Sequence, residues 1–245
     1  MQPVSPLPPA SEKERAVQDM FTAIAHRYDL NNTLLSLGLH HSWKRLAVKI
    51  SEAADGDAVL DLCTGTGDLA VLLARQVGLK GRVIGLDLNE RMLEFGRRKI
   101  KRSGTTENVI LLLGNAESLQ FCDRTFQAVT VAFGIRNVSD VRAALCEMFR
   151  VLKPGGRAVC LEFSRPTSRP LRKLYDFYSF TILPRIGRWV SRDRTGVYHY
   201  LPASIRAFPD QERFKELFEE VGFSPVTYRN LTGGIVAIHV GVKPR

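Results

Sequence analysis

The sequence of 245 residues lacks any run of 18 apolar residues, whereas a membrane-spanning helix needs about 20. It is also poor in cysteine. Its four cysteines form no Cys-x-x-Cys pair and have no histidine at ligand spacing, so neither a disulfide framework nor a metal site is predicted. We expect reduced thiols at Cys63, Cys122, Cys146 and Cys160. Because no apolar run is long enough to span a membrane, any action at a membrane is expected to take place from its surface.

The first ten residues lack the features of a secretory signal. They contain four prolines, no basic start and no apolar run, which is typical of a disordered leader. We therefore expect a cytoplasmic protein with a leader at 1–10 and a single domain at 11–245. The chain, 44% hydrophobic, is long enough for one well-buried α/β core, and a second full domain would be crowded.

The charge is unbalanced. Thirty-five Lys and Arg residues against 25 Asp and Glu residues give a net charge of +10, which favours a nucleic acid, an anionic membrane or an acidic ligand as partner. Two segments carry this excess: residues 90–102 hold six basic and two acidic side chains, and residues 165–195 hold eight and two. No appended nucleic-acid recognition module is visible, so nucleic-acid binding is kept only as the alternative of a different class.

Apolar spacing predicts three helices before the first strand, within residues 11–53. Residues 29–32 are predicted to form a turn after the first helix, and Gly38 to end a short second one. The adjacent His40 and His41 would point about 100° apart on a helix and are interpreted as surface residues. The apolar positions are Val17, Met20, Phe21, Ile24 and Tyr28 in the first helix and Trp43, Leu46, Ala47 and Ile50 in the third.

From residue 58 onward, short apolar runs alternate with amphipathic helices, which predicts βαβ crossovers and a parallel sheet. A helix at 210–221 then precedes two strands joined by a short glycine turn, which we expect to pair antiparallel. The α/β core thus covers 54–164 and 210–245. Strands are predicted at 58–62, 82–86, 109–113, 128–132, 157–163, 225–230 and 235–240, helices at 68–77, 90–103 and 140–152, and a turn at 154–156.

The segment 165–209 interrupts this alternation and is long for a connection, so it is predicted to be an inserted substrate lid. Its apolar residues recur at helical spacing beside basic ones, up to Pro184. Core packing accounts for part of this face, and the rest would form an entry for an apolar substrate at a membrane surface. These residues are Leu171, Leu174, Tyr175, Tyr178 and Ile182.

The loop after the first strand carries the strongest functional signal. Beyond Asp61, Gly65 and Gly67 let a ligand approach the backbone where the next helix begins. The glycines alone also match a dinucleotide site, so an NAD dehydrogenase is an alternative. Carboxylates at Asp61 and Asp68, however, would repel a pyrophosphate and attract the ammonium and sulfonium groups of S-adenosylmethionine. S-adenosylmethionine is therefore the predicted cofactor.

Residues after the next two strands fit the same cofactor. Asp87 ends the second strand, 20 residues after Gly67, where an acceptor for two ribose hydroxyls is expected. Leu88 would cover the adenine, and the amide of Asn115, after the third strand, would hydrogen-bond its edge.

Eight segments carry a resemblance to a known family. They are Tyr28-Asp29, Leu37-Gly38-Leu39-His40, the loop Asp61–Asp68, Phe133-Gly134-Ile135-Arg136-Asn137, residues 150–156, Leu161-Glu162-Phe163-Ser164, Phe208-Pro209-Asp210-Gln211 and Asn230-Leu231-Thr232-Gly233-Gly234. From about residue 17 to the C-terminus the chain resembles the UbiE/MenG family of quinone C-methyltransferases. The resemblance implies a class I, Rossmann-like methyltransferase fold with a seven-stranded, mostly parallel sheet and an antiparallel last strand. It also implies C-methylation of a prenylated quinol, either demethylmenaquinol, a ubiquinone-pathway benzoquinol, or both.

The resemblance further implies particular site residues. The family's cofactor contacts fall on Thr66, Asp87, Asn115 and Ala116. A fifth contact position is often serine in the family and is Ala132 here, so a contact at this position would involve only the backbone. The family's active-site positions fall on Arg136 and Asn137.

Methylating a ring carbon requires the electron-rich quinol, which loses a hydroxyl proton as the carbon attacks. Arg136 stays protonated, so it is predicted to stabilise phenolate charge, while Asn137 hydrogen-bonds a quinol oxygen. The alternative for Arg136 is a structural bond to a carboxylate or a helix end. The proton would pass to water or, as alternatives, to Tyr198, His199 or Tyr200.

Joined to this resemblance, the charge distribution favours an anionic membrane over nucleic acid as the partner. We expect a peripheral protein on the inner face of the cell membrane, where a prenylated quinol dissolves. A homodimer is compatible with the sequence.

Overall fold

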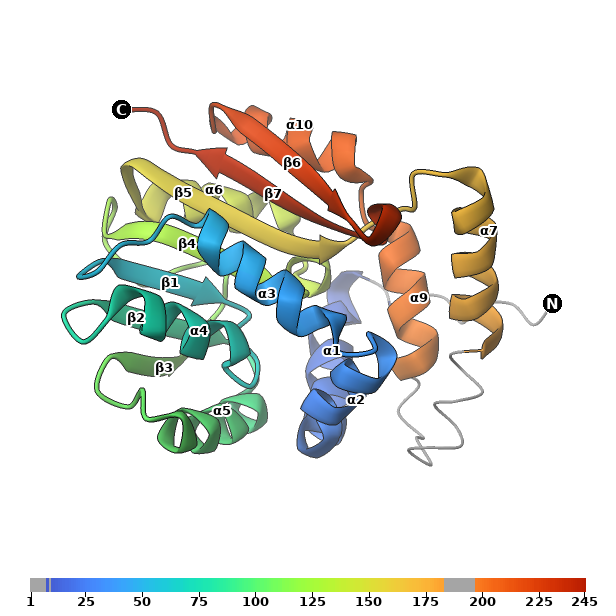
Figure 1. Ribbon diagram of the computed structural model, residues 1–245, viewed down its shortest axis with the longest axis horizontal. Coiled ribbons are helices and arrows are strands. Elements are labelled where there is room, and N and C mark those ends of the chain that lie inside the picture. Colours follow the sequence, from blue (N-terminus) through green and yellow to red (C-terminus); the bar gives the residue numbers. More distant parts are fainter. Residues whose placement is uncertain (1–7, 9, 183–196) are drawn as a thin grey trace.

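The computed structural model describes Pro8, residues 10–182 and residues 197–245, and is built around one seven-stranded sheet in the order β3-β2-β1-β4-β5-β7-β6 (Figure 1). All neighbouring strands are parallel except β7, which runs antiparallel to both β5 and β6. The predicted mostly parallel sheet is confirmed. The strands are β1 (Ala58–Leu62), β2 (Arg82–Asp87), β3 (Val109–Leu113), β4 (Phe126–Ala132), β5 (Leu152–Phe163), β6 (Val226–Leu231) and β7 (Val236–Val242).

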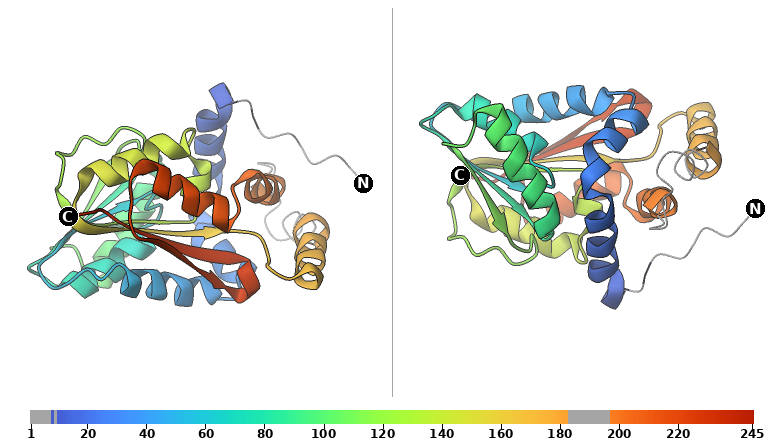
Figure 2. Two further views of the ribbon diagram at one scale, coloured as in Figure 1. Left: turned by 90° about the horizontal axis from the view of Figure 1, so that it is seen from above. Right: turned by 90° about the horizontal axis from the view of Figure 1, so that it is seen from below.

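Helices cover both faces of the sheet (Figure 2). On one face lie α3 (Leu39–Ile50), α4 (Asp68–Val77) and α5 (Glu90–Ser103), and on the other lie α6 (Val141–Val151) and α10 (Gln211–Val221). The central strand β1 is buried on both sides because it lies between β2 and β4 and beneath helices on each face. The core on the α6 and α10 side is rich in aromatic residues, including Phe126, Phe214, Phe218 and Phe223.

The caps of these helices fix where each begins. The side chains of Asn89, Asp140 and Asp210 accept hydrogen bonds from the backbone N–H groups of Met92, Ala143 and Arg213. Each cap satisfies an amide that has no partner within its helix. Asn89 follows β2 directly, so this cap also holds the start of α5 at the carboxyl end of the sheet.

Four helices gather at that same end: α1 (Ala10–Ile24), α2 (Tyr28–Leu35), α7 (Arg169–Phe177) and α9 (Val197–Ala207) (Figure 1). A 3₁₀ turn, Ala25–Arg27, joins α1 to α2, and a π-helical turn, Tyr178–Ile182, follows α7. Pro184, and the predicted leader apart from Pro8 and Ala10, lie outside the described residues. Among those that are described, no helix has the length and apolar character to cross a membrane.

The structure corrects the predicted turn at residues 29–32, which belongs to the helix α2. The first of its polar side chains, Asp29, is bound by partners elsewhere in the chain. The Asp29 carboxylate accepts a hydrogen bond from the Thr66 hydroxyl at 2.6 Å and forms an ion pair with Lys99 at 2.6 Å. These tertiary contacts outweigh the local preference of Asp and Asn for turns.

His40 is also corrected, since it is buried and not a surface residue. Its Nε2 lies 3.2 Å from the Thr33 hydroxyl oxygen. Burial, reinforced by the nearby Lys44 charge, lowers the pKa of His40 to about 4. The neutral ring therefore serves as a packing and hydrogen-bonding group at neutral pH.

The predicted turn at 154–156 lies inside β5, which starts at Leu152. Gly155 adopts a φ of 78°, and its N–H donates to the Lys243 carbonyl at 2.8 Å. The register with β4 shifts between Phe126 and Ala128. Because its backbone pairs with neighbouring segments of the same chain, the Pro-Gly-Gly sequence forms an irregularity within a strand and not a separate turn.

Candidate active site

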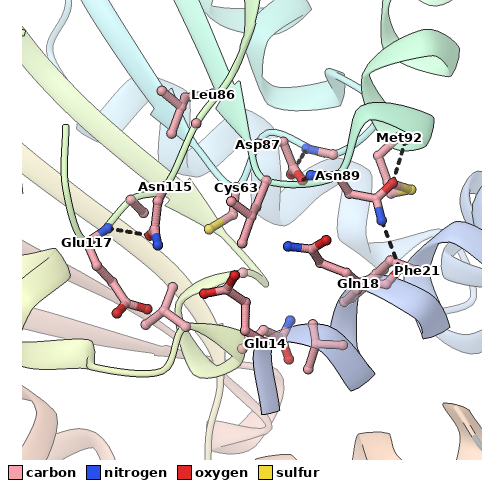
Figure 3. A pocket seen from close by; sticks show the side chains of 18 of the residues that line it. Glu14, Gln18, Phe21, Cys63, Leu86, Asp87, Asn89, Met92, Asn115 and Glu117 are labelled. Atoms are coloured by element: carbon pink, nitrogen blue, oxygen red, sulfur yellow. Dashed lines mark hydrogen bonds between the residues drawn. The ribbon is translucent and has the colours of Figure 1, made fainter. Parts of the chain in front are cut away.

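A cavity opens at the carboxyl ends of β1, β2, β3 and β4. A parallel sheet places its ligand sites at this edge, where strand order reverses direction. The residues predicted from the sequence that line the cavity are Gly65, Asp87, Leu88, Asn115, Ala116, Ala132 and Asn137. Figure 3 shows several of the lining side chains, which come from segments far apart in the chain.

The two glycines of the loop after β1 play different parts. Gly65 lines the cavity with a φ of 58°, and a Cβ added there would meet the Met92 side chain at 3.3 Å. Gly67 does not line the cavity but takes a φ of 77° immediately before α4. Both dihedrals fall in the left-handed region that glycine adopts without strain. The first glycine lies on the cavity wall, and the second makes the turn.

Asp87 holds the loop and faces the cavity at once. Its Oδ2 accepts a hydrogen bond from the Gly65 N–H at 2.8 Å, and its Oδ1 accepts one from the Asn89 N–H at 2.9 Å. Burial raises the pKa of this carboxyl, and these amides counter the rise. Each oxygen keeps a second lone pair, so the carboxylate can still accept hydrogen bonds from a ribose diol.

The amide of Asn115 is oriented by its own loop. Its Oδ1 accepts a hydrogen bond from the Glu117 N–H at 2.8 Å. The Nδ2 group makes no hydrogen bond to any described residue and is available to an acceptor in the cavity. Ala116 is buried next to it, and Ala132 ends β4 on the cavity wall. This geometry fits an adenine edge bound at Asn115.

The structure places neither Asp61 nor Asp68, the two acidic residues of the predicted cofactor loop, on the cavity wall. Asp61 is 1% exposed and does not line the cavity, because its carboxylate accepts hydrogen bonds from the hydroxyls of Thr64 at 2.6 Å and Thr130 at 2.8 Å. Burial raises the pKa of Asp61 to about 7. Burial alone would also raise the pKa of Asp68, but Lys44 and Lys99 bind its carboxylate and hold the pKa well below its usual range.

Thr66 also binds protein groups, and its hydroxyl does not face the cavity. It is buried outside the cavity lining, where its hydroxyl donates to Asp29 Oδ1 and accepts from Lys99 Nζ at 2.8 Å. These bonds tie the loop after β1 to α2 and α5. Thr66, Gly67 and Asp61 therefore shape the loop, while Gly65 and Asp87 face the ligand space.

The helix α1 forms a wall of the cavity that sequence reasoning missed. The side chains of its Glu14, Gln18 and Phe21 lie across the space from Asp87, Asn115 and Glu117 (Figure 3), and Val17 also lines the cavity. Two contacts hold the helix there. Asn89 Nδ2 donates to the Gln18 carbonyl at 2.9 Å, and Lys13 Nζ donates to the Val138 carbonyl at 2.6 Å. The apolar stripe through Val17 and Phe21 was the available signal, but it was interpreted only as a helix face.

Arg136 and Asn137 lie in a 3₁₀ turn, Ile135–Asn137, directly after β4. Asn137 lines the cavity, but Arg136 does not. The Arg136 side chain is buried against Glu162, with Nη1 at 2.7 Å from the carboxylate and its Nε without a partner in the described structure. Burial raises the pKa of Glu162, and the guanidinium opposes that rise. This contact matches the alternative interpretation of Arg136 as the partner of a carboxylate.

The strand order and the position of the cavity define a class I methyltransferase fold. A solved structure of this class, a possible histamine N-methyltransferase from Thermotoga maritima, is similar at a TM-score of 0.64 and 20% identity, covering 92% of this chain and 98% of that one. This likeness concerns the fold alone.

The sequence comparisons define the family. Residues 10–243 match the model of the ubiE/COQ5 methyltransferase family, so the chain belongs to that family. It is 51% identical to a ubiquinone/menaquinone biosynthesis C-methyltransferase of Erwinia tasmaniensis, over 95% of this chain and 92% of the relative. It is 48% identical to the protein of the same name from a Marinomonas species, over 96% and 93%. The predicted cofactor, S-adenosylmethionine, is confirmed by this membership.

Proposed function

We propose that this methyltransferase transfers a methyl group to a ring carbon of a prenylated quinol, with demethylmenaquinol as the substrate and menaquinol as the product. One observation carries the proposal: Asp87 and Asn115, the proposed cofactor-binding residues, line the same cavity as Asn137. The names of the relatives support a quinone-type substrate. A ubiquinone-pathway benzoquinol is the alternative head group.

In this mechanism the chain's own residues bind and orient the reactants. Bound S-adenosylmethionine supplies an electrophilic methyl group. Asp87 would accept hydrogen bonds from the ribose hydroxyls, and Asn115 would donate one to the adenine. Asn137 would donate a hydrogen bond to the quinol oxygen on which negative charge grows during attack. The Arg136 guanidinium contributes positive charge from behind this wall and cannot take the proton, because it stays protonated.

A mass-spectrometric assay tests this proposal. Purified protein with S-adenosylmethionine should convert reduced demethylmenaquinone to a product heavier by one CH₂ unit. The oxidised quinone serves as the control and should not react, because the ring must be electron-rich to attack. Methylation of only the corresponding benzoquinol would overturn the assignment of the head group, and methylation of neither quinol would overturn the function.

The segment 165–209 is proposed to act as the lid through which the prenyl tail enters. A second cavity lies between α7, the π-helical turn and α9. Its walls combine apolar Pro166, Pro202 and Ile205 with Arg165 and Arg172. The side chains of Tyr198 and His199 lie outside the described residues, so the alternative of His199 as proton acceptor stays a prediction.

We further propose that α7 docks on an anionic membrane. Its Leu174 and Phe177 are 64% and 57% exposed, and the same helix carries the basic residues Arg172 and Lys173. In a flotation assay, the protein should rise with vesicles containing anionic lipid, and Leu174→Ser with Phe177→Ser should reduce this several-fold. Leu79→Ser is the matched control, because Leu79 is 75% exposed at the opposite, amino end of β2. Equal flotation of wild type and double variant would contradict the proposal.

A further inference from the structure

The amide of Asn137 is held from the lid side by a tyrosine. Tyr200 lies on α9, which packs against the 3₁₀ turn carrying Arg136 and Asn137. Its hydroxyl donates a hydrogen bond to Asn137 Oδ1 at 3.0 Å. Tyr200 is half-buried, and the charges of both Arg136 and Glu162 act on its phenol.

This bond fixes which half of the amide faces the cavity. A primary amide offers one carbonyl oxygen and one NH₂ group. A phenol that donates to Oδ1 leaves Nδ2, which makes no hydrogen bond to any described residue, as the free group of a side chain that lines the cavity. With the amide so oriented, Asn137 presents a hydrogen-bond donor and not an acceptor to a ligand.

We propose that Tyr200 is a positioning residue that orients Asn137 so that its NH₂ group donates to the quinol oxygen on which negative charge develops. The inference rests on the proposed quinol methylation. A donor aimed at developing charge stabilises the transition state more than the neutral ground state. Tyr200 therefore acts on turnover through Asn137, without touching the cofactor.

The hydrogen bond to Asn137 argues against the alternative role of Tyr200 as the proton acceptor. A phenol that already donates its proton to Asn137 has no negative oxygen to offer as a base. Burial further raises the pKa of Tyr200, so the phenol stays protonated at neutral pH. Its contribution is the direction of one hydrogen bond.

Kinetics of Tyr200→Phe test the proposal. Removing the hydroxyl should lower kcat about tenfold while leaving KM for S-adenosylmethionine unchanged, because one hydrogen bond to an orienting partner is lost. Tyr228→Phe is the matched control, since Tyr228 also donates to a side chain, Glu212 Oε2 at 3.0 Å, but on the exposed strand β6. This control should keep wild-type kcat.

A double-mutant cycle separates positioning from a general structural effect. In the Asn137→Ala background, adding Tyr200→Phe should cause no further loss of kcat, because the amide that Tyr200 orients is gone. Independent, multiplying losses would overturn the proposal, as would a Tyr200→Phe enzyme with wild-type kcat. Failure of the wild-type enzyme to methylate any quinol would instead refute the proposed function, so the two failures are distinguishable.

Discussion

Replacing Asp87 by alanine is expected to weaken the binding of S-adenosylmethionine by about two to three orders of magnitude. The carboxylate is the proposed acceptor for both ribose hydroxyls, and each hydrogen bond to a charged group contributes about 1.5–3 kcal/mol. A loss of about 3–4 kcal/mol corresponds to this change in dissociation constant. Isothermal titration of the purified variant with the cofactor measures it directly.

Two controls separate binding from folding in this experiment. Asp87 also accepts the N–H groups of Gly65 and Asn89, so urea unfolding without cofactor must show that the variant keeps its fold. Asp123→Ala removes an exposed carboxylate that pairs only with Arg150 among the described basic residues, and should bind the cofactor as wild type does. Unchanged affinity in Asp87→Ala would remove Asp87 from the site.

The buried pair of Arg136 and Glu162 supports the second prediction. Glu162→Gln leaves a buried guanidinium without its charge partner, so the free energy of unfolding should fall by about 3–5 kcal/mol. Replacing both residues, with Arg136→Met and Glu162→Leu, removes the unpaired charge and should bring the free energy of unfolding back to within about 2 kcal/mol of wild type. Urea denaturation measures both values.

The stable double variant then reveals what Arg136 does in catalysis. If its charge stabilises the phenolate, the folded double variant should lose methyl transfer by about two orders of magnitude or more. Full turnover in that variant would leave Arg136 with a structural role alone. Arg142→Met provides the baseline, because its ion pair with Glu220 is exposed and should contribute less than about 1 kcal/mol to stability.

Local patterns were sufficient for the sheet and for the residues that end its strands. The alternation of buried strands and amphipathic helices predicted most elements to within two residues, because burial on a sheet between helices imposes that pattern on the chain. Asp87 and Asn115 were predicted to face the cofactor because residues at or just after the end of a parallel strand lie at the carboxyl edge of the sheet.

Local patterns did not predict which partners the acidic side chains of these loops bind. Asp61 lies one residue before the end of β1, and Asp87 ends β2. The hydroxyls of Thr64 and Thr130 bind Asp61 in the core, whereas the amides of Gly65 and Asn89 hold Asp87 on the cavity wall. The sequence predicted that the Asp68 carboxylate would act on a ligand, but in the structure it forms ion pairs with Lys44 and Lys99. Such pairings join residues distant in the chain, so no local pattern encodes them.

The sequence by itself therefore determined the α/β architecture, the family and the edge of the sheet where the cofactor binds, since each follows from periodicity and motifs along the chain. Only the tertiary structure decided that α1 walls the cavity, that Arg136 faces Glu162, and that Tyr200 reaches Asn137 from a helix 63 residues further along. The physical reason is that hydrogen bonds and ion pairs of buried groups depend on which surfaces meet in the folded chain, and that meeting is a property of the whole fold.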